Sequence, residues 1–128
     1  MESGELEKWF DLMRLELETA YLAASTPWGQ SGFSGPYERW VACRRPIAEC
    51  VVSDGTFLDI GCANGYLLEC LMRWASDRLI AVDPWGLDIS EKLVELAKQR
   101  LPAYEGLGDR PGKRLRERRM NIYIGMME

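Results

Sequence analysis

This 128-residue sequence has no histidine, and its four cysteines form no C-x-x-C pair. Zinc sites and Cys–His nucleophilic pairs need those residue types, so we expect no metal site and no chemistry of that kind. The sequence also has no run of 18 apolar residues, and its first five residues are acidic and polar. We therefore expect neither a membrane span nor a secretion signal. Free buried thiols in a reducing cytoplasm are the default for such cysteines, so we expect a cytoplasmic protein.

Neither lysine nor arginine occurs between Thr56 and Met72, although this stretch contains the most informative pattern of the chain. Residues 57–60 predict a strand, residues 61–65 a glycine turn, and residues 66–74 a helix with a continuous apolar face. A strand, turn and helix in this order bring backbone N–H groups and the positive end of a helix against a ligand. A pyrophosphate would have backbone donors alone here. A zwitterion with one carboxylate needs fewer donors than a pyrophosphate, because the helix N-terminus can bind its carboxylate and nearby acids can bind its amine.

Two common nucleotide-binding patterns do not fit this turn. The dinucleotide pattern G-x-G-x-x-G fails because the turn reads Gly61-x-Ala63-x-Gly65 and Tyr66 takes the place of the third small residue. A P-loop is excluded because no Gly-Lys-Ser/Thr follows. Oxidoreduction with a nucleotide cofactor is therefore a weaker alternative.

The motif Asp59-x-Gly61-x-Ala63-x-Gly65 resembles motif I of the class I S-adenosylmethionine-dependent methyltransferases, with Ala63 in place of the middle glycine. Residues 86–90, Gly-Leu-Asp-Ile-Ser, resemble the second motif of that family, a strand that ends in an acid and leads into a helix. The resemblance covers about residues 20–103. It implies an α/β fold, namely a partial Rossmann-like methyltransferase sheet with N-terminal helices. It also implies S-adenosylmethionine as the cofactor and methyl transfer to an unidentified acceptor, small or otherwise.

The acid that binds the ribose has two candidates, Asp83 and Asp88. An acid about 20 residues beyond such a turn can accept hydrogen bonds from both ribose hydroxyls. We favour Asp88, since the helix N-cap residue Ser90 follows it and places it at the carboxyl end of a strand. Asp83 precedes Pro84, and its simplest interpretation is a solvated loop acid.

The resemblance thus implies a cofactor site formed by the glycine turn and the second acid. Asp59 would orient the turn or the amino group of the cofactor, the turn would admit the methionine moiety, and Ile89 would pack on the adenine. No residue is identified as a catalytic base. The predicted cofactor-binding residues are Asp59, Gly61, Cys62, Ala63, Asn64, Gly65, Asp88 and Ile89.

The first 54 residues predict two segments ahead of this unit. Residues 1–25 have the apolar spacing of an amphipathic helix, which packs on the domain or binds a partner. Residues 26–54 predict a glycine-rich loop followed by a helix that Pro46 must kink or split. The loop carries Trp28 and Phe33.

A similar loop precedes motif I in some bacterial methyltransferases, and this resemblance implies a lid over the cofactor. Its carboxylate would then contact one of three arginines, Arg39, Arg44 or Arg45. The alternative is a surface loop whose aromatic side chains pack on the first helix.

The end of the chain departs from the family. A βαβα unit over residues 55–104 is followed by a basic tail over 105–128, which is too short for the remaining strands of such a sheet. Either the chain is truncated after the second βα unit, or residues 121–124 add a third strand and a partner chain completes the site. Truncation is favoured, and with it the alternative function of a non-catalytic remnant or regulatory subunit. The tail holds six basic and four acidic residues. No aromatic side chain lies among its arginines to stack on bases, so nucleic-acid binding is not expected.

Overall fold

The structure is a computed structural model that describes residues 2–101 and 122–124. It has the mixed α/β architecture expected from the sequence. Strands β1 (Gly55–Ile60) and β2 (Val82–Asp88) pair in parallel over the full length of β1. The short strand β3 (Ile122–Ile124) pairs in parallel with the other side of β2, which agrees with the interpretation of this segment as a third strand. The order in the described sheet is β1-β2-β3, so β1 lies at an edge.

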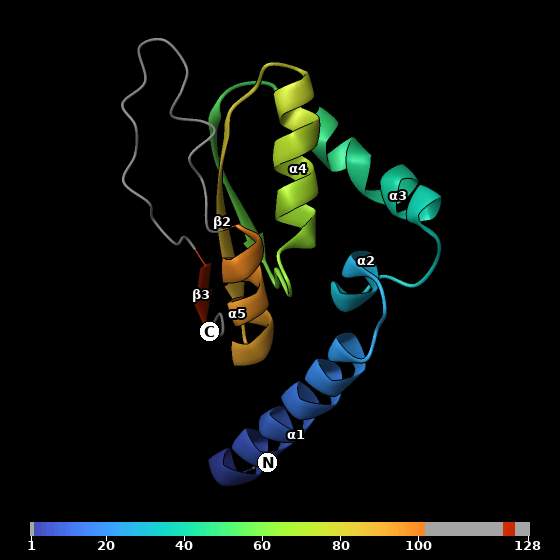
Figure 1. The fold of residues 1–128 in the computed structure, drawn as a ribbon. Helices are drawn as coiled ribbons and strands as arrows, with labels where there is room; N and C mark the ends of the chain where they lie inside the picture. The colour runs from blue at the N-terminus through green and yellow to red at the C-terminus, as the bar shows by residue number, and fades with distance from the viewer. Residues whose placement is uncertain (1, 102–121, 125–128) are drawn as a thin grey trace.

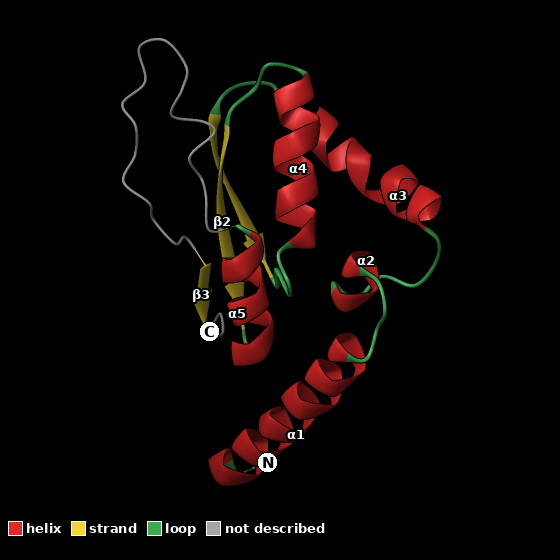
Figure 2. Ribbon diagram, viewed as in Figure 1, coloured by secondary structure: helices red, strands yellow, loops and turns green. Residues whose placement is uncertain are grey.

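Five helices accompany these strands in the described part of the chain: α1 (Ser3–Leu22), α2 (Pro27–Gln30), α3 (Tyr37–Glu49), α4 (Tyr66–Asp77) and α5 (Glu91–Arg100). The succession β1-α4-β2-α5 is the βαβα unit predicted from the two motifs. Helix α4 lies alongside the strands and α3 lies next to α4, whereas α1 extends away from the sheet (Figure 1). Figure 2 gives the same view by secondary structure, with α4 and α5 beside the strands.

The core lies on one face of the sheet. Phe57 of β1 packs against buried side chains of both α4 and α5, among them Leu68 and Val94. Its neighbours along the strand point to the opposite face, because successive side chains of a strand alternate. There Leu58 and Ile60 remain 55% and 54% exposed. The described helices therefore leave this second face of β1 largely uncovered.

Helix α1 packs on the rest of the molecule far less than its apolar spacing suggested. None of its residues is buried, and Trp9 and Leu12 are about half exposed. Its large apolar side chains are distributed around the helix axis instead of forming one stripe, so a single contact cannot bury them. The expectation that this amphipathic helix packs on the domain holds only for the side that faces α2 and α5.

Pro46 does not split the helix that contains it. Helix α3 runs continuously from Tyr37 to Glu49 with Pro46 inside it. A proline removes one backbone hydrogen bond from a helix, so other contacts must hold the chain. Trp40 and Ala48 are buried against the core, and Arg78 donates hydrogen bonds to the carbonyls of Ala48 and Val51 at the helix end.

Candidate functional site

The turn between β1 and α4 has a left-handed backbone at three positions, two of which are glycine. Gly61 and Gly65 have φ of 79° and 77°, and Ala63 has φ of 48°. A Cβ atom on Gly65 would lie 3.0 Å from Cβ of Ala97, so only glycine allows the turn to contact α5 this closely. A Cβ atom on Gly61 would meet nothing within 4 Å. Gly61 therefore leaves open space on its side of the turn.

Asp88 ties the end of β2 to this turn. One of its carboxylate oxygens accepts a hydrogen bond from the backbone N–H of Ala63, and the other accepts from the N–H of Ser90, both at 2.9 Å. A carboxylate offers about four acceptor positions, so these bonds leave capacity for hydroxyl groups of a ligand. Asp88 is the last residue of β2, as the sequence predicted.

Asp83 is not the solvated loop acid of the sequence interpretation. It is buried inside β2, pairs in register with Thr56, and accepts a hydrogen bond from Nε1 of Trp85 at 3.3 Å. The interpretation failed because Asp83, before Pro84, was expected to lie ahead of the last stretch of the strand in a solvated loop. An extended strand accommodates the fixed φ of proline, and β2 continues through it.

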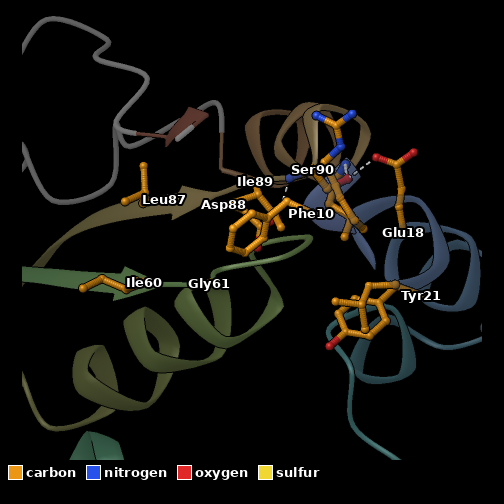
Figure 3. Close-up of a pocket in the computed structure, with 12 residues that line it drawn as sticks. Phe10, Glu18, Tyr21, Ile60, Gly61, Leu87, Asp88, Ile89 and Ser90 are labelled. Atoms are coloured by element: carbon orange, nitrogen blue, oxygen red, sulfur yellow. Dashed lines mark hydrogen bonds between the residues drawn. The ribbon is translucent and has the colours of Figure 1, made fainter. Parts of the chain in front are cut away.

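A pocket of about 400 Å³ lies at the carboxyl ends of β1 and β2 (Figure 3). The sheet contributes Ile60 and Gly61 from the end of β1 and Leu87 and Asp88 from β2. Ile89, Ser90 and Leu93 continue the wall toward α5. Ligands of open α/β sheets bind at this edge.

Helix α1 forms the opposite wall, which sequence reasoning missed. Its pocket-lining residues are Phe10, Arg14, Leu17, Glu18 and Tyr21. Their spacing of three and four residues was visible in the sequence as one side of a helix. Nothing local indicated that this side, with its two charged residues, would face a cavity formed by residues some 40 to 80 positions later.

Three of the eight predicted cofactor-binding residues line this pocket, namely Gly61, Asp88 and Ile89. The other five lie around the turn but are not among the pocket-lining residues. Asn64 is one of them and is fully buried. Its amide nitrogen donates to the carbonyl of Pro27, and its amide oxygen accepts from the N–H of Tyr66. Asn64 therefore shapes the turn and anchors α2.

Burial and neighbouring charges raise the pKa values of two groups at the turn. The pKa of Asp59 rises from 3.8 to about 6, chiefly through burial and also through the nearby carboxylate of Asp88, with Arg44 acting in the opposite direction. Burial also raises the pKa of the Cys62 thiol to about 12, with Asp88 and Asp59 adding to the shift. Cys62 is thus a buried neutral thiol, and nucleophilic chemistry at its sulfur is not favoured.

The aromatic residues of the glycine-rich loop contact α3 and α4. The ring of Trp28 lies 6.3 Å from that of Tyr66, and Phe33 meets Trp40 edge to face at 5.4 Å. The Arg44 guanidinium lies 5.1 Å from the Phe33 ring centroid. These residues do not pack mainly against α1, which corrects the interpretation of a surface loop packed on the first helix. They do not line the pocket, and the lid over the cofactor stays a prediction. Arg39 and Arg45 do not line this pocket either.

Arg100, the last residue of α5, connects that helix to the turn. Its Nε donates to the carbonyl of Asn64 at 3.3 Å, and its Nη1 lies 3.0 Å from a carboxylate oxygen of Glu69. The guanidinium also lies 5.3 Å from the centre of the Tyr66 ring. The turn is therefore fixed from two sides, by Asp88 and by Arg100.

Within residues 2–101, no group of three or more histidine, cysteine or acidic side chains is arranged to hold a metal ion. No helix in the described segments combines the length and apolar character needed to cross a membrane. Comparison with known proteins found no matching family model, curated protein or solved structure. The turn, the two acids and the pocket are thus the observations from which a function is inferred.

Proposed function

We propose that this chain binds S-adenosylmethionine at the carboxyl ends of β1 and β2, as the Rossmann-like cofactor unit of a class I methyltransferase. The observation that carries the proposal is the hydrogen bond from the N–H of Ala63 to Asp88. It joins the glycine turn and the ribose-binding acid beside one pocket, which Gly61, Asp88 and Ile89 all line.

The residues present fit this cofactor. Asp88 keeps acceptor capacity for ribose hydroxyls, and Ile89 offers an apolar contact to the base. The turn precedes α4, a 12-residue helix whose N-terminus favours a carboxylate. The carboxylates of Asp59 and Asp88 lie close enough to influence one another and provide negative charge for a sulfonium or an amine. A volume of about 400 Å³ lies within the usual range for small-molecule sites.

Isothermal titration calorimetry with S-adenosylmethionine tests the proposal. Asp88→Asn replaces one acceptor oxygen by an NH2 donor, which removes one of its two backbone hydrogen bonds and weakens acceptance from ribose hydroxyls, so we expect its affinity to fall by about tenfold or more. Asp77→Asn, an exposed acid on α4, is the matched control and keeps the wild-type affinity. Equal affinity in Asp88→Asn and the wild type would contradict the proposal, as would tighter binding of NAD than of S-adenosylmethionine.

A second candidate function is a non-catalytic or regulatory subunit of a longer methyltransferase. The uncovered face of β1 favours it, because parallel sheets are normally covered on both faces. Leu58 and Ile60 would then meet a partner chain that supplies the acceptor site. Formation of S-adenosylhomocysteine by the isolated chain, with a panel of small acceptors, would exclude this candidate.

A further inference from the structure

Glu18 is the residue through which α1 makes its polar contact with the α/β unit. Its carboxylate accepts a short hydrogen bond from the hydroxyl of Ser90, 72 positions later in the chain. Its other oxygen lies 3.9 Å from Nζ of Lys92. The Glu18 side chain is only 13% exposed, whereas that of Lys92 is 72% exposed. The bond to Ser90 is therefore the stronger of the two, since solvent screens exposed ion pairs.

The first turn of α5 is a favourable place for this carboxylate. Ser90 is the N-cap of α5, and its hydroxyl oxygen accepts from the N–H of Leu93 while its proton goes to Glu18. The N-terminal end of a 10-residue helix carries partial positive charge, which stabilises a nearby anion. Figure 3 shows Glu18 reaching from α1 toward Ser90 along the dashed bond.

Among the described residues, α1 makes few polar contacts with the rest of the chain, and its apolar contacts are with α2 and α5. Its other described side-chain bonds stay within the helix, from Arg14 to Asp11 and from Thr19 to the carbonyl of Leu15. It buries no residue, although most of the stability of a helix in a protein comes from packing of its apolar face. The bond of Glu18 to Ser90 is therefore an important contact for the position of α1, beside its apolar contacts with α2 and α5.

The position of α1 in turn determines whether the pocket has its second wall. Phe10, Leu17 and Tyr21 of α1 face the strand ends across the cavity, and Glu18 itself lines it. If α1 detached, the carboxyl ends of β1 and β2 would lie open to solvent. A ligand in the pocket would then keep only its contacts with the turn and β2.

We propose that Glu18 is a positioning residue that holds α1 across the pocket, so that loss of the Glu18–Ser90 bond speeds ligand release. The ligand part of this inference rests on the proposed function, whereas the attachment of α1 through Glu18 does not. The two parts are tested in separate experiments.

The first experiment measures hydrogen exchange of α1 in the free protein by mass spectrometry. Glu18→Ala removes the bond to Ser90, so we expect protection in α1 to fall by about tenfold, the effect of losing one charge-assisted hydrogen bond. Glu16→Ala removes an exposed glutamate from the same helix and serves as the matched control, with protection unchanged. Equal protection in Glu18→Ala and Glu16→Ala would overturn the attachment.

The second experiment measures release of S-adenosylmethionine by stopped flow. We expect the dissociation rate to rise by about tenfold in Glu18→Ala, to rise less in Glu18→Gln, which retains an acceptor, and to stay unchanged in Glu16→Ala. Faster exchange of α1 with an unchanged dissociation rate would overturn the role in ligand release. Absence of binding in the wild type would refute the proposed function, and the exchange experiment would still decide how α1 is held.

Discussion

The ionised form of Asp59 lowers the free energy of unfolding, because its carboxylate is partly buried beside Asp88. Burial and the neighbouring Asp88 raise its pKa to about 6 in the folded chain, against an ordinary value of 3.8. The folded state therefore holds its proton more tightly than the unfolded state. The stability that this provides is present below pH 4 and is lost as the pH rises through 6. A carboxylate kept at such a cost is a candidate for binding a cation.

We predict that Asp59→Asn stabilises the protein above pH 6 by about 1–3 kcal/mol, because the uncharged amide avoids the burial of a charge. The variant should also lose the fall in stability between pH 4 and pH 6. Urea unfolding at pH 4.5, 5.5 and 7 measures both effects.

Glu95→Gln, at an exposed position of α5, is the control for this change and should leave the pH profile as it is in the wild type. A variant Asp59→Asn that is less stable than the wild type at pH 7 would mean that Asp59 is held by favourable contacts in its ionised form. The electrostatic account of this residue would then be wrong.

The C-terminal end of α4 has a leucine, Leu79, at a position with a left-handed backbone. The N–H of Ile80 donates to the carbonyl of Ala75, and that of Leu79 to the carbonyl of Ser76. These bonds form a Schellman motif, whose left-handed position is usually glycine. Here Leu79 occupies it with φ of 61° and a side chain that is 80% exposed. Burial of the Leu79 side chain therefore does not offset the strain of its backbone.

We predict that Leu79→Gly stabilises the protein by about 1 kcal/mol, because glycine adopts this conformation without the penalty of a Cβ atom. Thermal unfolding measures the gain. Leu79→Ala removes the exposed side chain but keeps the Cβ atom, so it should change the stability by less than about 0.5 kcal/mol. An equal gain in both variants would point to the side chain and not to the backbone.

The βαβα unit could be predicted because its signals are local. The apolar strand before Gly61, the helical pattern after Gly65 and the cap at Ser90 each lie within a few residues of the element that they define. Pro46 and Pro84 misled the prediction for the opposite reason. Contacts with residues distant in sequence keep α3 intact and extend β2 through Pro84, and proline alone does not reveal them.

Only the pocket wall formed by the strand ends could be predicted, because only its signals are local in the sequence. Gly61, Asp88 and Ile89 follow from the two motifs, which place them at strand ends. Glu18 does not, since its partner Ser90 lies far along the chain and only the folded structure brings the two together. The residues 102–121, which include most of the predicted basic tail, lie outside the described structure.

The uneven placement of the core leads to a contrast between two leucines. Leu71 of α4 is fully buried, whereas Leu58 of β1 lies on the uncovered face. We predict that Leu71→Ala lowers the free energy of unfolding by about 3 kcal/mol and that Leu58→Ala lowers it by less than about 1 kcal/mol. Urea unfolding of the purified chain compares the two.

The comparison of Leu58→Ala with Leu71→Ala also tests whether the second face of β1 is exposed in solution. If Leu58→Ala costs as much as Leu71→Ala, the second face of β1 is covered in solution, by another copy or by a segment of this chain. Repeating the measurement at several protein concentrations separates these cases, since only association between copies depends on concentration.

Arg100 connects the end of α5 to residues much earlier in the chain. Its guanidinium holds the carbonyl of Asn64 and the carboxylate of Glu69 from the final position of α5. Removal of Arg100 would leave Asp88 as the remaining contact of the two that fix the glycine turn. A change of sequence at Arg100 therefore affects the glycine turn 36 residues upstream, although the two lie at opposite ends of the βαβα unit in the chain.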